Sequence, residues 1–363
     1  MAEVPTTRHY LRPIGALPAS AAAGAASPAA IIVAGRADLR FAAAEVIERH
    51  GERVGRRIVA ADVLPGQAGE LAGLLEDLCR PREPIAGLTL ERARIMGIVN
   101  VTPDSFADGG RYGETHAAVA HALQLEAEGA DLLDIGGEST RPGAEPVDVE
   151  EEWRRVGPVI EALRPRVQAR LSIDTRNAEV MRRAARAGVH LINDVSALSH
   201  DPASLAVAAE TGLPVVLMHS RGDPRTMQQK PVYADVVLDV CDALEARIEA
   251  CEGAGIPRSR LIVDPGIGFG KTLAHNMALI ASLGLLHGLG CPILLGASRK
   301  SFIGRLAGAA EPDDRLPGSL AAALIGVAQG AQILRVHDVA ATRQAVAVWE
   351  AARLAGSPAR PIR

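Results

Sequence analysis

The sequence lacks the features that mark several large classes of protein. Its four cysteines, Cys79, Cys241, Cys251 and Cys291, show no C-x-x-C spacing, which argues against a zinc site or a disulfide framework and favours a reduced, cytoplasmic setting. A formal net charge of -4 argues against the clustered basic surface that nucleic acids require. No apolar run has the length of a transmembrane helix. We therefore expect neither nucleic acid nor a membrane as a partner.

The Ala-rich segment at residues 15–35 also lacks something, namely the continuous strongly apolar run of an export signal. It contains almost no leucine, and Pro18, Gly24 and Pro28 interrupt it. This composition favours retention in the cytoplasm over export.

Short apolar runs, each followed by a polar cluster and then by helical periodicity, occur eight times after residue 94. Each run is too short for a helix and too continuously apolar for a half-exposed strand, which indicates strands buried on both faces. We expect an α/β protein whose residues 89–363 form a (β/α)8 TIM barrel. The runs span residues 95–99, 132–135, 171–173, 191–192, 215–218, 261–263, 292–295 and 333–334.

Residues 1–88 are expected to form a small α/β extension of unknown role. The patterns predict strands at 31–34 and 57–59 and helices at 41–49 and 69–79, followed by a Pro-rich linker at 81–84. This segment shows no paired carboxylates, metal-ligand spacing or phosphate loop. We interpret it as a packing or dimerisation appendage rather than as a second active site.

Short polar side chains end several of the predicted strands, and in barrels of this class the strand C-termini form the active face. Asp174, Asn193 and Asp264 follow the third, fourth and sixth strands. A carboxylate accepts two hydrogen bonds side by side, which suits the N–C–NH2 edge of a guanine or pterin ring. Each residue alone could instead cap a helix. Their three equivalent positions favour a heterocycle site.

Two long loops follow the first two strands. Residues 100–110 contain two acids, an aromatic residue and a Gly pair, which is typical of a loop that covers substrate. Residues 136–144 combine glycines and hydroxyls with Arg141 and could wrap an anion. Arg141 could alternatively form a surface ion pair with Glu138 or Glu145.

Three further segments complete the predicted rim. Ser298, Lys300 and Ser301 follow the seventh strand and suit a carboxylate or phosphate. Arg335 and His337 lie two apart at the end of the eighth strand, so both can grip one polyphosphate. Residues 264–272 mimic a P-loop, but proline stands where its first glycine belongs. We expect these glycines to allow close approach to a flat ring.

Six motifs in order, at residues 96–106, 137–144, 193–195, 264–271, 298–301 and 335–338, resemble those of the dihydropteroate synthases, and the resemblance covers residues 90–355. It implies condensation of 6-hydroxymethyl-7,8-dihydropterin pyrophosphate with p-aminobenzoate, which gives 7,8-dihydropteroate and pyrophosphate for folate biosynthesis. It also implies Mg2+ as cofactor, inhibition by sulfonamides and a homodimer. The first 90 residues have no counterpart in the family pattern.

The resemblance also implies residue roles. For the pterin it implies Asp174, Asn193, Met218, Asp264, Phe269 and Lys300. For the pyrophosphate it implies Asn100, Arg141, Arg335 and His337, with Asn100 as the Mg2+ contact. For p-aminobenzoate it implies Phe106, Thr140, Pro142, Lys300 and Ser301. Asp108, Arg141, Asp174 and Lys300 are the residues expected to act in catalysis.

Two alternatives share part of this pattern. A pterin-dependent methyltransferase would keep Asp174, Asn193 and Asp264 but would not need the anion-binding residues around Lys300 and Arg335. A catalytically silent paralogue would bind pterin only. Its expected signature is loss of Asn100, Arg141 or Lys300, and all three are present.

Overall fold

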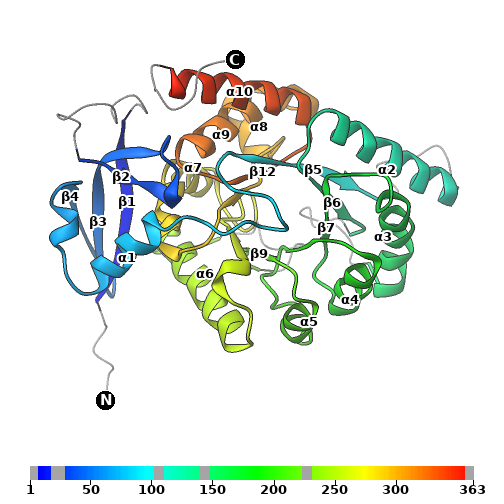
Figure 1. The fold of residues 1–363 in the computed structure, drawn as a ribbon, viewed down its shortest axis with the longest axis horizontal. Coiled ribbons are helices and arrows are strands. Elements are labelled where there is room, and N and C mark those ends of the chain that lie inside the picture. Colours follow the sequence, from blue (N-terminus) through cyan, green and yellow to red (C-terminus); the bar gives the residue numbers. More distant parts are fainter. Residues whose placement is uncertain (1–6, 18–28, 102–109, 139–146, 223–230, 356–363) are drawn as a thin grey trace.

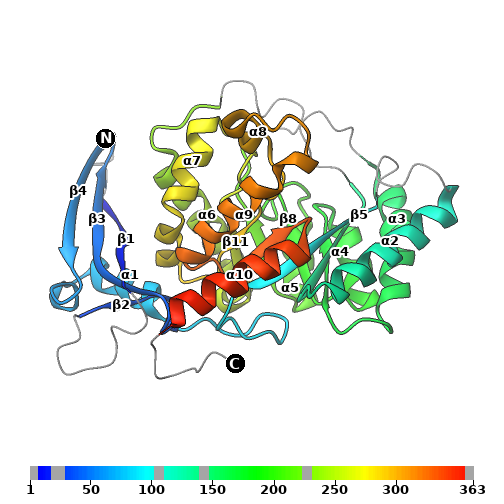
Figure 2. The same cartoon turned by 90° about the horizontal axis from the view of Figure 1, so that it is seen from above.

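The fold consists of a parallel barrel with an antiparallel sheet beside it (Figure 1). The computed structural model describes residues 7–17, 29–101, 110–138, 147–222 and 231–355. In both views the antiparallel sheet lies at one side of the barrel, with β1 nearest to it and β4 farthest away (Figures 1 and 2).

The barrel contains eight parallel strands within the described residues, in the order β10-β9-β8-β7-β6-β5-β12-β11. Val263 of β10 bridges to Ile293, and its amide donates to the carbonyl of Pro292 at 2.9 Å, which closes the ring. The eight predicted strands are thereby confirmed. They are β5 (Arg94–Asn100), β6 (Leu132–Gly136), β7 (Arg170–Asp174), β8 (Leu191–Asp194), β9 (Val215–Met218), β10 (Leu261–Asp264), β11 (Leu294–Leu295) and β12 (Ile333–Val336).

Helices follow the strands and cover the outside of the barrel. Local sequence explains several boundaries: Asp148 and Asp235 cap α3 and α6 by accepting backbone amide hydrogens, and Gly188 ends α4 in the left-handed conformation. The helices are α2 (Gly110–Ala127), α3 (Val149–Leu163), α4 (Ala178–Ala187), α5 (Ser204–Thr211), α6 (Val236–Gly253), α7 (Leu273–Ala281), α8 (Ser301–Ala307), α9 (Leu316–Ala328) and α10 (Val339–Leu354), with short 3-10 turns at η5 (Arg258–Arg260), η6 (Leu283–Leu289) and η7 (Asp313–Arg315).

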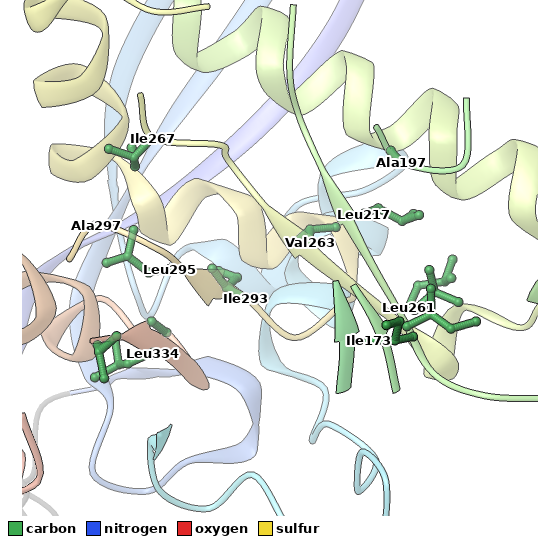
Figure 3. Packing of buried hydrophobic residues seen from close by; sticks show 14 of the residues in the cluster. Ile173, Ala197, Leu217, Leu261, Val263, Ile267, Ile293, Leu295, Ala297 and Leu334 are labelled. Carbon is green, nitrogen blue, oxygen red and sulfur yellow. The ribbon is translucent and has the colours of Figure 1, made fainter. Parts of the chain in front are cut away.

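The outward face of the barrel strands supplies the main hydrophobic core. Ile173, Leu217, Val263 and Leu334 are fully or almost fully buried in one cluster that also contains residues of the surrounding helices (Figure 3). Each such side chain contributes roughly 1.5 to 3 kcal/mol through burial. This packing holds the strand ends, and hence the polar residues on them, in position.

The N-terminal extension is a four-stranded antiparallel sheet, as far as the chain is described, with one helix packed on it. Its central strand is β3, which pairs with the three others. The elements are β1 (Thr7–Leu17), β2 (Ile31–Ile32), η2 (Val33–Gly35), β3 (Arg40–His50), β4 (Arg53–Ala60), η3 (Leu64–Gly66) and α1 (Glu70–Cys79).

The helix predicted at residues 41–49 is wrong, because this segment is strand β3. Val46 is buried beneath α1, whereas its neighbour Ile47 is buried in the cluster of the barrel. Adjacent side chains on opposite faces are the geometry of a strand. Pairing with β1 and β4 on both edges therefore overrides the helix-like spacing of the apolar residues.

Ionic and polar contacts dock the extension on α6 of the barrel. The Tyr10 hydroxyl donates to Asp242 at 2.7 Å, and Arg49 contacts both Asp239 (2.7 Å) and Asp242 (3.2 Å). Farther along, Arg56 pairs with Asp235 at 2.8 Å. One face of the sheet thus matches a row of acids on one helix, so the extension and the barrel are held in a defined orientation.

Candidate active site

Inward-facing side chains form two layers in the barrel. The lower layer is apolar and consists of Met96, Leu132, Leu191, Val216, Ile262, Leu294 and Ile333. Since strand side chains alternate, the residues two positions further along also face inward. They form the upper layer and comprise Ile98, Asp134, Asn193, Met218, Asp264, Gly296 and Arg335. The apolar layer closes the barrel from below, and polar residues face its open end.

Four side chains of this region form one buried polar network. Arg335 contacts Asp134 through Nε (2.6 Å to Oδ2) and Asp174 through Nη2 (2.7 Å to Oδ2). Asn193 Nδ2 donates to the same Oδ2 of Asp134 at 2.9 Å. Burial raises the pKa of Asp174, and the Arg335 cation opposes that rise. The structure thus brings together three predicted site residues and a fourth, Asp134.

Asp134 was not among the predicted site residues. It lies inside an apolar run, where its only signal was a carboxylate in an otherwise buried strand. Such a residue is costly unless it is paired, so a buried carboxylate in a strand core indicates a polar network. The signal was present but did not identify the partners.

Asp264 lies on the opposite side of the ring of strands, at the end of β10. Its Oδ1 accepts the amide hydrogen of Gly266 at 2.7 Å, and its Oδ2 lies 3.7 Å from where a Cβ on Gly296 would stand. Burial raises its pKa to about 6, although Lys300 and Lys271 act against this rise. The carboxylate is therefore held by the backbone on one oxygen.

Phe269, on the loop after β10, and Lys300, on the loop after β11, contact each other. The Lys300 ammonium lies over the Phe269 ring, 4.1 Å from its centroid, in a cation–π contact. Met218, the last residue of β9, is buried. The next residue, His219, donates its backbone amide hydrogen to the carbonyl of Asp264. Met218 and Phe269 thus supply apolar surface, and Lys300 a positive charge, to the part of the site that contains Asp264.

A second residue that sequence reasoning missed is Lys271, which is 2% exposed. Its Nζ contacts His219 Nδ1 (2.9 Å), the carbonyl of His219 (3.2 Å) and the carbonyl of Phe269 (2.9 Å). Burial lowers the pKa of Lys271 to about 7. Burial and the Lys271 charge lower the pKa of His219 to about 3, which leaves its imidazole neutral. Lys271 therefore ties the loop after β9 to the loop after β10.

The glycines after β10 serve backbone packing. A Cβ on Gly266 would stand 1.9 Å from the carbonyl oxygen of His219, and one on Gly270 would stand 2.4 Å from that of Arg221. Both glycines also have positive φ. At both positions the missing Cβ makes room for the loop after β9, and the expected approach of a flat ring to these glycines stays a prediction.

The residues expected to bind anions lie on the rim formed by β11 and β12. His337 contacts the buried Ser298 through its amide (3.2 Å) and through Nδ1 (3.1 Å). Arg299 points into ion pairs with Asp338 and Asp313. Arg299 is thereby engaged in ion pairs, and the anion-binding residues expected on this rim are Arg335, Lys300 and His337.

The remaining predicted residues divide into two groups. Asn100 ends β5 half-buried, and Ser301 is exposed as the first residue of α8. Glu138 pairs with Arg176 at 2.8 Å. The other residues lie outside the described part of the chain, namely Phe106, Asp108, Thr140, Arg141 and Pro142.

Comparison with known proteins identifies the family. The family described as "Pterin binding enzyme" matches residues 96–337. The dihydropteroate synthase of Escherichia coli (strain K12) is 51% identical over 264 residues, which cover 73% of this chain and 93% of that protein. The chain belongs to the dihydropteroate synthase family.

Solved members of the dihydropteroate synthase family have the same fold. The Xanthomonas albilineans enzyme with 4-aminobenzoic acid is 54% identical, with a TM-score of 0.71 over 76% of this chain and 97% of that one. The same enzyme in complex with 7,8-dihydropteroate is 51% identical, with a TM-score of 0.68 over 76% and 97%. Residues before Met96 lie outside the family match, so the docked extension is additional to the family's barrel.

Proposed function

We propose that this chain is a dihydropteroate synthase, a transferase that joins 6-hydroxymethyl-7,8-dihydropterin pyrophosphate to p-aminobenzoate and releases pyrophosphate in folate biosynthesis. The observation that carries the proposal is the polar end of the barrel, where Asp174, Asn193 and Asp264 are all buried on the last two residues of their strands. Family membership supports the same reaction.

The pterin would lie at this end of the barrel. A pterin presents a row of N–H donors on one edge, and the free oxygens of Asp174, Asn193 and Asp264 are acceptors. A site built to accept such donors discriminates strongly, because an unmatched buried polar group costs about 1 to 3 kcal/mol. Met218, Phe269 and Lys300 would contact the ring and its edge.

The pyrophosphate would lie on the cations of the rim. Arg335 contacts Asp134 through Nε and Asp174 through Nη2. Its third nitrogen, Nη1, can therefore bind a phosphate oxygen while both ion pairs persist. His337 directly follows Val336, the last residue of the same strand, β12. We propose that Arg141, outside the described residues, adds a further cation when substrate is present.

The reaction itself requires charge stabilisation. As the bond from the pterin methylene carbon to the pyrophosphate oxygen breaks, that oxygen takes the electron pair and positive charge grows on the methylene. We propose that the carboxylates of Asp174 and Asp108 stabilise this charge. Arg335 would hold the pyrophosphate, and Lys300 would hold the carboxylate of p-aminobenzoate. The neutral arylamine then forms the C–N bond and loses a proton to solvent. A dedicated general base is not required.

We propose that p-aminobenzoate binds last, with its carboxylate at Lys300 and Ser301. Lys300 and Ser301 are consecutive at the start of α8, where Ser301 is exposed, so this short segment of the rim offers both an ammonium and a hydroxyl. Phe106, Thr140 and Pro142, on the loops outside the described residues, would complete this subsite.

Mg2+ is proposed as the cofactor, with Asn100 as its protein contact. The described residues contain no group of three or more His, Cys, Asp or Glu side chains able to hold a metal by themselves. This fits Mg2+, which commonly keeps several waters and binds mainly through substrate phosphates. When bound, the ion would neutralise charge on the pyrophosphate leaving group. Asn100 would contribute one amide oxygen.

We also propose a cytoplasmic homodimer. No helix among the described residues is long and apolar enough to cross a membrane. Leu306 on α8 and Ile325 on α9 expose apolar side chains, with 56% and 43% of their surface accessible, and could form a contact between copies. Light scattering that gives the mass of one chain would contradict the dimer.

Sulfonamide competition tests the proposed substrate pair. A sulfonamide resembles p-aminobenzoate, so it should compete with p-aminobenzoate and not with pterin pyrophosphate. A methyltransferase would show no such competition, and a silent paralogue would bind pterin without pyrophosphate release. Ser301→Ala should raise the KM for p-aminobenzoate and leave that for pterin pyrophosphate unchanged. Equal effects on both KM values would contradict the assignment of Ser301.

A further inference from the structure

Asp134 is the most deeply buried charged side chain of the polar network. It is fully buried in the middle of β6, and one oxygen, Oδ2, accepts hydrogens from both Asn193 and Arg335. The other oxygen, Oδ1, has no hydrogen-bond partner among the described residues and is shielded from solvent. A buried carboxylate is destabilising unless its partners compensate it, so its presence beneath the site calls for a functional explanation.

The contact with Asn193 sets the orientation of the amide. A carboxylate offers only acceptors, so the Asn193 group that faces it has to be the NH2. The amide oxygen of Asn193 then faces away from Asp134 and is available as an acceptor. Without Asp134, the amide could rotate and present donors to the donor edge of a pterin.

The contact with Arg335 sets the plane of the guanidinium. Asp134 holds Nε at 2.6 Å and Asp174 holds Nη2 at 2.7 Å, so two carboxylates fix one edge of the planar group. The remaining Nη1 is directed away from both. Because a guanidinium binds phosphate through a rigid fork, the direction of this nitrogen determines where the anion can lie.

We infer that Asp134 is a positioning residue for the proposed reaction, which orients both the Asn193 amide toward the pterin and the Arg335 guanidinium toward the pyrophosphate. The two halves of the substrate are thereby recognised by side chains that share one buried oxygen atom. This inference rests on the proposed function, but binding of the bare pterin tests it without turnover.

The test compares three variants by calorimetric titration with 6-hydroxymethyl-7,8-dihydropterin. Asp134→Leu removes every acceptor, and the pterin Kd should rise about tenfold or more. Asp134→Asn keeps one acceptor oxygen and should restore much of that loss. Ser172→Ala is the matched control: Ser172 is the register partner of Asp134 on β7 and is equally buried, and it should bind like the wild type.

A double-mutant cycle separates positioning from general damage. In an Asn193→Ala background, where no amide remains to be oriented, Asp134→Leu should change the bare-pterin Kd by less than about threefold. Circular dichroism and thermal melts confirm that each variant is folded. If folded Asp134→Leu binds bare pterin as tightly as Ser172→Ala does, or if its effect is the same with and without Asn193, the inference is wrong.

A second variant keeps the test decisive if Asp134→Leu does not fold. Asn193→Asp places a second carboxylate against Asp134, so one proton should be shared between them at low pH. Compared with the wild type at the same pH, this variant should bind pterin much more weakly above about pH 7, and the difference should shrink as the pH falls toward 5. A pH dependence identical to that of the wild type would contradict the juxtaposition. Failure of the proposed function would appear differently, as wild-type protein that binds pterin but forms no dihydropteroate.

Discussion

Arg335 and Asp174 form an ion pair at the open end of the barrel, with Nη2 2.7 Å from Oδ2. In the proposed function, Asp174 binds the pterin and Arg335 binds the pyrophosphate. The ion pair therefore joins the two subsites directly. It also keeps a buried carboxylate next to a cation before any substrate arrives, so that the acceptor needed by the pterin is already in place.

Replacement of Arg335 by methionine should weaken binding of both ligands, but to different extents. Pterin pyrophosphate loses a direct cation contact, so its Kd should rise about 100-fold, whereas bare pterin loses only the ordering of Asp174 and its Kd should rise less than about tenfold. Titration of each ligand measures this. Arg343→Met, which removes a half-exposed arginine 3.7 Å from Asp131, is the control. Equal losses for both ligands would contradict the assignment of Arg335 to pyrophosphate.

Pterin affinity should fall as the pH drops through about 6. Burial raises the pKa of Asp264 to about 6, and once protonated this carboxyl can no longer serve as a full acceptor. Asp264→Asn should bind more weakly at pH 7.5 and should show a flatter pH profile. Calorimetric titrations from pH 5 to 8 check this. A profile that keeps its acid limb in Asp264→Asn would assign the titration to another group.

Lys271→Met should lower both pterin affinity and stability, because the carbonyls of His219 and Phe269 lose a buried donor. We expect a loss of about 1 to 3 kcal/mol in the free energy of unfolding. Burial lowers the pKa of Lys271 to about 7, below its ordinary value of 10.5. Between these values the unfolded chain binds more protons, so the contribution of Lys271 to stability rises with pH.

Chemical denaturation at pH 7.5 and 9.5 measures that contribution. The stability difference between wild type and Lys271→Met should grow toward the higher pH, because the wild type gains from the neutral lysine and the variant does not. A difference that is constant or shrinks would contradict a neutral buried lysine. Thr272→Ala, which removes the helix cap of α7 next in sequence, controls for general loosening of the loop.

The extension should lose its fixed orientation when Asp242 is replaced by alanine. This carboxylate receives the Tyr10 hydroxyl at 2.7 Å and contacts Arg49 at 3.2 Å, and it is partly exposed. We expect a decrease of about 1 kcal/mol in the free energy of unfolding. Glu48→Ala breaks an exposed pair with Arg57 and should be nearly neutral. If both variants behave alike, the contacts on α6 do not hold the extension.

The sequence predicted the barrel well because its strands are buried on both faces, which leaves short continuous apolar runs. The polar strand ends followed from the same pattern, and Asp174, Asn193 and Asp264 lie where the runs place them. Asp134 was missed because it lies within a run rather than at its end. Its role depends on Asn193 and Arg335, which come from strands distant in the chain.

The extension was predicted less well for a related reason. The segment at residues 40–50 has helix-like apolar spacing, and only pairing with β1 and β4 decides that it is a strand. Strand β1 itself was not predicted, since alternation along Thr7–Leu17 is weak. Likewise, the sequence around Lys271 does not distinguish it from an ordinary loop lysine, because its burial depends on the loop after β9, whose His219 carbonyl accepts a hydrogen bond from Lys271. Such contacts between distant segments are not encoded in local periodicity.

The central claim is that the polar layer of this barrel joins a pterin to p-aminobenzoate. The most direct measurement is simultaneous quantification of pyrophosphate and 7,8-dihydropteroate after incubation of the chain with pterin pyrophosphate, p-aminobenzoate and Mg2+. We predict that the two products form in equal amounts, only when both substrates are present, and that Asp174→Asn with Asp264→Asn abolishes both. Absence of dihydropteroate with the wild-type chain, or undiminished formation with the double variant, would contradict the account.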